Sequence, residues 1–175
     1  MTERFIHRLA LLSAELGGVV LAAVIVMTGA SILGRALNGL GLGPVPGDFE
    51  LVEAGIGFAV FAFLPIAQLK GAHATVDVFT SLMGVKANRV LLAIWEVAMA
   101  LVFALIAWRL FEGLKQKFAN GETTFLLQFP VWWVFAACMA PAVIAVIVAV
   151  WSAYDRLRAV ATGLDTRPVS GESVH

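Results

Sequence analysis

The sequence is poor in charged residues and in the residue types that carry catalysis or bind metals. Only 14% of its 175 residues are Asp, Glu, Lys or Arg, against about 25% in a typical soluble domain. One cysteine, Cys138, excludes an internal disulfide and a cysteine-rich metal site. The 12 basic residues balance the 12 acidic ones, so nucleic acid is not an expected partner. No Ser-His-Asp arrangement, Gly-rich phosphate loop or Cys-based metal motif is present, so the sequence predicts no catalytic centre, cofactor or metal site.

Apolar residues dominate the chain, at 61% with a mean hydropathy of +0.91. They gather in four runs, at 9–33, at 49–69, from Asn88 past Trp108, and at 130–154. Each run can cross about 30 Å of hydrocarbon as a helix, and helical backbone satisfies its own hydrogen bonds in lipid. The sequence therefore predicts an all-α integral membrane bundle of four transmembrane helices over residues 1–164. The polar residues 165–175 are expected to form a disordered cytoplasmic tail.

Turn and capping residues agree with these spans. Asp48 is a predicted N-cap of the second span, with Glu50 in its positive first turn, and Pro130 suits the first turn of the fourth. A third helix reaching residue 119 would be about 48 Å long. It is therefore expected to tilt, to bend near Gly113 or to project from the membrane.

Basic residues predict the orientation, because they are enriched on the cytoplasmic side of membrane proteins. With the N-terminus in the cytoplasm, eight Lys and Arg residues face the cytoplasm and four face the other side, so both termini are predicted to be cytoplasmic. The cytoplasmic set is Arg4, Arg8, Lys70, Lys86, Arg89, Arg156, Arg158 and Arg167. The opposite set is Arg35, Arg109, Lys115 and Lys117.

The segment between the second and third spans has an amphipathic pattern. Its apolar residues fall at helical spacing, with polar residues between them, which predicts a short helix lying in the membrane interface. The apolar positions are Val76, Phe79, Leu82 and Met83.

Three carboxylates, Glu15, Glu53 and Glu96, lie within or near apolar spans. A charge at membrane depth is a candidate functional group, so an ion or proton site is one interpretation. The other is that these side chains reach headgroup water or pair with a basic residue. His73 and Asp77 are four residues apart, which predicts a structural hydrogen bond on one helix face.

Small residues recur every four positions in several spans, a spacing that favours close helix packing in membranes. The first span has Ala10, Ala14, Gly18 and Ala22, and the second has Gly55, Ala59 and Ala67. The fourth span has Ala137, Pro141, Ala145, Ala149 and Ala153. These stripes predict the faces along which helices meet, within this chain or against a partner.

Four short pieces of the chain form a further pattern. Arg35 closes the first span in Ser-Ile-Leu-Gly-Arg, and Glu50-Leu51 opens the second. His73 and Asp77 form a His-x-x-Val-Asp motif, and Pro130 lies in Phe-Pro-Val-Trp-Trp. With four spans and this length, the chain resembles the small, DctQ-type membrane subunit of tripartite ATP-independent periplasmic (TRAP) transporters.

The resemblance implies a subunit of a transporter and not an enzyme. Such subunits bind a large multi-span transport subunit in the bacterial inner membrane, and the pair receives substrate from a periplasmic binding protein. The complex imports an organic acid, driven by an ion gradient. The small subunit is implied to be a scaffold without a substrate site, whose partners are these two proteins and the surrounding lipid.

Two other functions stay open from the residues alone. Glu15 in the first span is compatible with a self-sufficient small proton-coupled transporter. The other is a membrane-anchor subunit of a redox enzyme, which would need haem-binding histidines or a quinone site.

Overall fold

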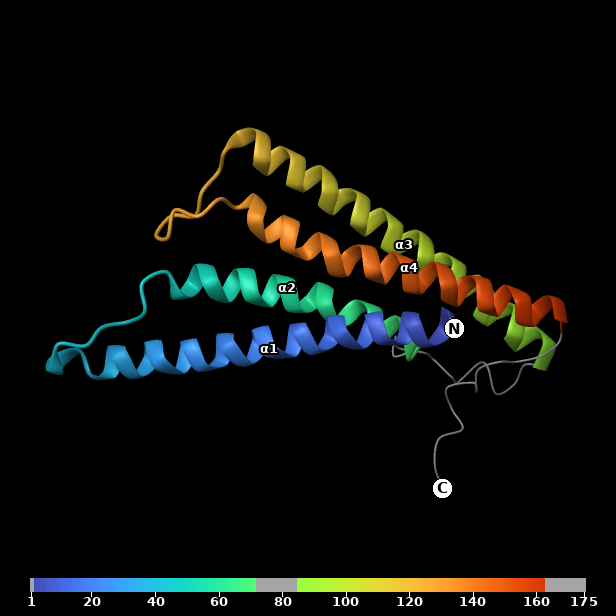
Figure 1. Cartoon of the computed structure of the whole chain (residues 1–175), viewed down its shortest axis with the longest axis horizontal. Helices are drawn as coiled ribbons and strands as arrows, with labels where there is room; N and C mark the ends of the chain where they lie inside the picture. Colours follow the sequence, from blue (N-terminus) through green and yellow to red (C-terminus); the bar gives the residue numbers. More distant parts are fainter. Residues whose placement is uncertain (1, 72–84, 163–175) are drawn as a thin grey trace, which may run out of the picture.

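The computed structural model describes residues 2–71 and 85–162, and four long helices make up most of them. The helices are α1 (Thr2–Ala36), α2 (Asp48–Leu69), α3 (Val85–Asn120) and α4 (Trp132–Thr162), with a 3-10 turn, η1 (Asn38–Leu40), after α1 (Figure 1). All four are long and apolar enough to cross a membrane. Extended pairing within the described ranges is limited to one bridge, between Thr123 and Pro130. Within the described residues, the predicted all-α bundle of four helices long and apolar enough to span a membrane is therefore confirmed.

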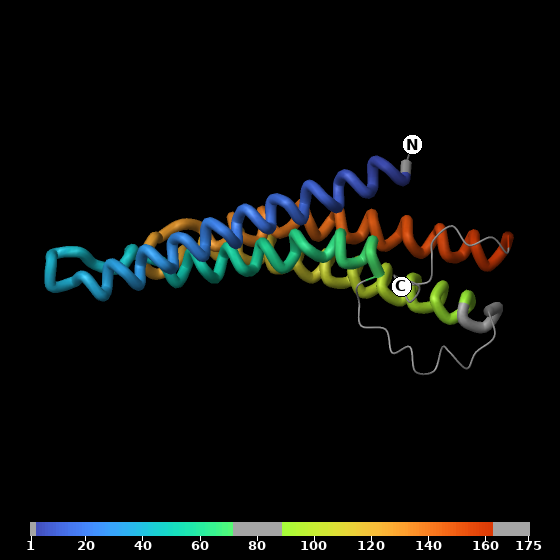
Figure 2. The backbone as a smooth tube through the Cα atoms, turned by 90° about the horizontal axis from the view of Figure 1, so that it is seen from below, coloured from blue at the N-terminus to red at the C-terminus, as the bar shows by residue number. Residues whose placement is uncertain are grey.

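The helices pack side by side in the order α1, α2, α4, α3 (Figure 1). Figure 2 shows that all four run along one long axis of the molecule. The α1–α2 and α3–α4 loops lie at the same end of this axis, which we call the loop end. The start of α1 and the end of α4 lie at the opposite end, which we call the termini end. This arrangement makes α2 a central helix that contacts both α1 and α4.

The bounds of α2 agree closely with the predicted second span, whereas the other helices differ in length from the apolar runs that predicted them. Helix α1 begins at Thr2 and α4 continues to Thr162, both well beyond the apolar runs that predicted them. Both helices continue into polar residues, because helical backbone hydrogen bonds can form in water as well as in lipid. Helix α3 continues through Gly113, and a Cβ there would lie 2.7 Å from the Phe135 ring. The structure assigns Gly113 to close packing against α4.

The contact between α1 and α2 is made by small residues that lie next to the predicted stripe of α1. Ser13 Oγ donates a 2.9 Å hydrogen bond to the Ala62 carbonyl, and a Cβ on Gly17 would lie 2.8 Å from Ala62 Cβ. Gly18, from the predicted stripe, has no neighbouring atom within 4 Å of its Cβ position. The α1–α2 contact therefore runs through Ser13 and Gly17, whereas Ala10 of the predicted stripe is buried in a cluster with Val148 of α4.

The small-residue stripe of α4 is confirmed for four of its five members. Pro141, Ala145, Ala149 and Ala153 are buried, whereas Ala137 is exposed. Near the termini end, Val148 of α4 packs with Ile6 and Ala10 of α1 in a small apolar core.

The predicted interfacial helix lies outside the described residues, and the structure does not confirm it. Its apolar positions Val76, Phe79, Leu82 and Met83 all fall within 72–84. The predicted tail at 165–175 also lies outside the described residues.

Candidate functional site

A polar cluster joins α1 to α2 at the loop end. The Ser31 hydroxyl and the Arg35 guanidinium both donate hydrogen bonds of 2.5 Å to Oδ2 of Asp48. The backbone N–H of Val45 donates to Ser31 Oγ at 3.3 Å, which ties the connecting loop to the same point. Ser31 and Arg35 are four residues apart and so share one face of α1. The carboxylate of Asp48 therefore holds the end of α1 to the start of α2.

Asp48 was predicted as the N-cap of α2, but the structure places it as the first helical residue. Gly47 is the N-cap, with a φ of +71°, and as a glycine it supplies no side-chain cap. Asp48 Oδ1 accepts the N–H of Phe49, in the same first turn, at 2.8 Å, while its Oδ2 is bonded across the loop to Ser31 and Arg35. A Cβ on Gly47 would lie 2.3 Å from Leu127 Cγ. Glycine is required there by the backbone conformation and by the approach of the α3–α4 loop.

Glu50 connects α2 to the α3–α4 loop. Its Oε1 accepts the backbone N–H of Leu126 at 2.5 Å, and its Oε2 accepts that of Leu127 at 2.9 Å. Both oxygens are thus used by consecutive amides of a segment far away in the sequence. Hydrogen bonds to a charged acceptor are stronger than those between neutral groups. Glu50 therefore fixes the position of this loop relative to α2.

The α3–α4 loop is a compact hairpin with an apolar tip. The Thr124 N–H donates to the Phe129 carbonyl at 3.0 Å, and the Val131 N–H donates to the Glu122 carbonyl at 2.9 Å. Phe125, at the tip, is 89% exposed. The hairpin thus presents an apolar side chain outward from a hydrogen-bonded base.

Pro130 occupies the base of this hairpin, where α4 is about to begin. Its carbonyl accepts the N–H of Trp133 at 3.1 Å, which starts the first turn. The assigned helix begins at Trp132, two residues later than expected. Pro130 therefore lies two residues before the first turn of α4, in which the sequence had placed it.

Glu122 closes the hairpin against the end of α3. Its carboxylate accepts hydrogen bonds from the Asn120 side chain, at 2.9 Å, and from the Lys117 ammonium. The hydrogen bond from Asn120, followed by that from Lys117, lowers the pKa of Glu122 below the usual range for a glutamate. The ionised form of Glu122 is therefore favoured in the folded hairpin.

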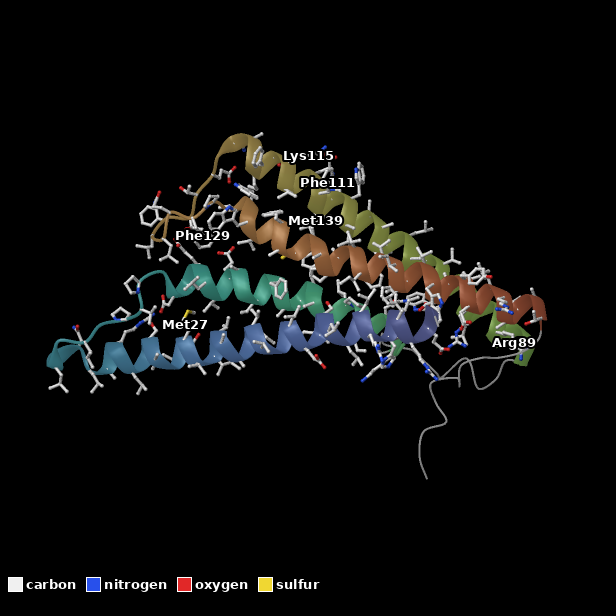
Figure 3. The ribbon with its side chains drawn as sticks, in the orientation of Figure 1. Met27, Arg89, Phe111, Lys115, Phe129 and Met139 are labelled. Carbon is white, nitrogen blue, oxygen red and sulfur yellow. The ribbon has the colours of Figure 1, made fainter. Side chains whose placement is uncertain are left out.

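A groove of about 650 Å³ lies among α1, α2 and α4 near the loop end. Met27 of α1 and Phe129 of the α3–α4 loop both lie at this end in Figure 3. The other lining residues are apolar as well: Val20, Ala23, Val24, Leu51, Ala54, Gly55, Phe58, Trp133, Val134 and Ala137. Apart from the indole N–H of Trp133, the side chains that line this groove carry no polar or charged group that would bind an ion or an organic acid.

The three carboxylates of the spans do not converge. Glu96 of α3 accepts a 2.6 Å hydrogen bond from the buried Gln68 of α2, near the termini end. Glu15 and Glu53 are exposed on the outward faces of α1 and α2. Within residues 2–71 and 85–162, no three His, Cys, Asp or Glu side chains gather as a metal site would require.

Three of the five motif residues lie at the loop end, where Arg35 bonds to Asp48, Glu50 bonds to the α3–α4 loop and Pro130 pairs with Thr123 at the base of the hairpin. The other two, His73 and Asp77, lie outside the described residues.

Sequence reasoning missed Ser31, Gln68 and Glu122. Ser31 was detectable from its position one turn before Arg35 in α1. The pairing of Gln68 with Glu96 depends on how two distant helices align, so no local pattern indicated it.

Comparison with curated individual proteins finds no match. A family model described as the DctQ component of tripartite ATP-independent periplasmic transporters matches residues 7–159. The match covers α2, α3 and both loops at the loop end, together with all but the first residues of α1 and the last residues of α4. The chain therefore belongs to the DctQ family, the small membrane component of TRAP transporters.

Proposed function

We propose that this chain is a fixed scaffold that braces the large transport subunit of a TRAP transporter and helps to dock its periplasmic binding protein. The complex would import an organic acid across the bacterial inner membrane, driven by an ion gradient. In this proposal the loop end faces the periplasm and both termini face the cytoplasm.

The packing of the helices supports a static role. Glycine and serine bring α1 against α2 at Gly17 and Ser13, and Gly113 brings α3 against α4. Such close contacts stabilise one arrangement of helices, because dispersion falls steeply with separation. The carboxylates of the spans are spread over different faces and depths, whereas a proton or ion path needs polar groups in sequence. The chain is thus better suited to support a moving partner than to move a solute.

The distribution of charge supports the proposed orientation. Arg4 and Arg8 start α1 at the termini end, and Arg156 and Arg158 lie near the end of α4. Basic residues concentrate on the cytoplasmic side of membrane proteins. The polar clusters around Asp48 and Glu50 would then lie at the periplasmic boundary, where a soluble binding protein arrives.

The hairpin tip supports a docking role at that boundary. Phe125 and Leu126 are exposed on a loop that Glu50 holds in place. Apolar side chains presented on a rigid loop lose little conformational entropy on binding, which favours a protein contact.

The docking role is tested with Phe125→Ser and Leu126→Ser in the assembled transporter. We expect a weaker dependence of uptake on the binding protein, seen as a higher half-saturating concentration, while the membrane complex purifies intact. Thr123→Ser, at the base of the same hairpin, is the control. An unchanged half-saturating concentration with both tip variants would remove the docking role and leave the scaffold role in place.

The segment around His73 and Asp77 is proposed to anchor the subunit in the membrane interface through Val76, Phe79, Leu82 and Met83. Apolar side chains at helical spacing favour such a position. Replacing Phe79 and Leu82 with serine is expected to loosen the complex or to lower uptake. If both quantities match wild type, the anchoring role is wrong.

A further inference from the structure

Glu53 lies on the outward face of α2, within a ridge of apolar side chains. Phe49, Glu53, Ile56 and Val60 are all exposed and follow one another at spacings of three and four residues. Residues at this spacing share one face of a helix. The faces of α2 that contact other helices are different, because Gly55, Ala59 and Ala62 pack inward. A carboxylate thus interrupts a surface that is otherwise suited to lipid or to another membrane helix.

Glu53 also differs from the other carboxylates of α2. Asp48 is held by Ser31 and Arg35, and Glu50 by the amides of Leu126 and Leu127. Glu53 makes no hydrogen bond or ion pair with any residue of 3–71 or 89–162. It lies five residues after Asp48, or about 7.5 Å along the helix axis. It is therefore deeper than the polar cluster that marks the loop end.

A carboxylate at this position is costly if only lipid surrounds it. Charged side chains in membrane spans almost always face other protein or a water-filled cavity, and they pair with groups of opposite charge. The exposed face of α4 makes the contrast clear, because Val143, Ile147 and Val150 form an uninterrupted apolar surface. A cation opposite Glu53 would offset this cost, whereas the surface of α4 carries no charge to offset.

We propose that the α2 face around Glu53 is where the large transport subunit packs, and that this subunit places an arginine or lysine opposite Glu53. This inference rests on the proposed scaffold function and adds which helix makes the contact. The partner surface is a membrane helix with apolar side chains that pack on Phe49, Ile56 and Val60. Its basic group lies about one to two turns below the loop end, where it replaces water around the carboxylate.

The first test is co-purification of the large subunit with Glu53 variants of the tagged full chain, expressed together in membranes. We expect Glu53→Arg to lower recovery of the large subunit by roughly tenfold or more, as when one member of a buried charge pair is lost. Glu53→Leu should also lower it, because a basic group is left unpaired, and Glu53→Gln should retain part of it. Ile56→Leu, on the same face with no change of charge, should match wild type.

The same variants also distinguish whether Glu53 faces a protein partner or lipid. If Glu53 faced lipid, Glu53→Leu would keep or increase recovery of the large subunit, and that result would overturn the inference. The isolated Glu53→Leu subunit should be at least as stable in detergent as wild type, which excludes misfolding as the cause of lost binding. If wild type itself recovers no large subunit, the proposed scaffold function fails, which is a different result.

A second test uses a photo-crosslinking residue at Ile56 of α2 or at Ile147 of α4, which are 47% and 46% exposed. The inference predicts a crosslink to the large subunit that is stronger from position 56. A signal from position 147 that equals or exceeds it would contradict the inference even if the charge variants bind normally.

Discussion

The carboxylate of Glu50, in the first turn of α2, accepts the backbone N–H of Leu127, in the α3–α4 loop, at 2.9 Å. The side chain of Leu127 in turn covers Gly47, where a Cβ would overlap it. A hydrogen bond to a carboxylate and a packing contact thus join the same two segments, the start of α2 and the α3–α4 loop, and hold them in a fixed relative position.

Glu50→Gln is expected to loosen the α3–α4 loop without unfolding the helices. An amide side chain has one acceptor oxygen and no charge, so it replaces at most part of the interaction with the two backbone amides. Hydrogen exchange of the amides at 124–131 should accelerate by roughly tenfold, the order expected for a lost hydrogen bond to a charged group. Glu53→Gln, one turn later on the outward face, is the control and should leave this exchange unchanged. Equal exchange in wild type and Glu50→Gln would show that the hydrogen bonds from Leu126 and Leu127 to Glu50 do not stabilise the loop.

Gly17→Ala and Gly18→Ala test the packing face of α1. A Cβ on Gly17 would lie 2.8 Å from Ala62 Cβ, so Gly17→Ala should destabilise the fold by about 1–3 kcal/mol, as overpacking does. Gly18→Ala meets no atom within 4 Å, and should be neutral or stabilising by up to about 1 kcal/mol through helix propensity. Thermal unfolding in detergent measures both. The reverse order of stability would mean that α1 packs on α2 through the other face.

Ser31→Ala is expected to weaken the junction between α1 and α2. Ser31 is 1% exposed and its hydroxyl links Asp48 to Val45, so its loss should cost about 1 kcal/mol. Arg35→Ala should lower the melting temperature less, because the Arg35 side chain is 60% exposed. Thr28→Ala is the control, since that hydroxyl bonds only within its own helix. A larger effect of Arg35→Ala than of Ser31→Ala would contradict this assignment.

The contribution of Glu122 to the stability of the hairpin should be lost only at acidic pH. The pKa of Glu122 is lowered in the folded state by Asn120 and Lys117. A lowered folded-state pKa contributes stability above the unfolded-state pKa, and this stability is lost as pH falls through the folded-state value. The difference in melting temperature between wild type and Glu122→Gln should therefore persist at pH 7 and shrink below about pH 4.3. A difference that shrinks while pH rises toward neutrality would have the wrong sign.

The sequence was sufficient to predict the four spans, because apolar runs of this length have only one stable form in lipid. The second span was predicted almost to the residue, since Gly47 and Asp48 mark its start. Helices α1 and α4 were predicted too short, because hydropathy detects the span and not the helix that continues beyond it.

Contacts between distant segments were harder to predict. Glu50 and Pro130 were singled out, but the partnership of Glu50 with Leu126 and Leu127 depends on where two loops meet in space. The packing face of α1 was missed for a related reason. Ser13 and Gly17 lie one position from the predicted stripe, and only the position of Ala62 distinguishes the two faces.

The central claim is that this chain supports a transport subunit and does not transport by itself. The most direct measurement is organic-acid uptake by sealed vesicles under an imposed ion gradient, with the purified chain alone, with the large subunit and binding protein alone, and with all three. We expect uptake above that of empty vesicles only when all three are present. Uptake by vesicles that contain this chain alone would contradict it.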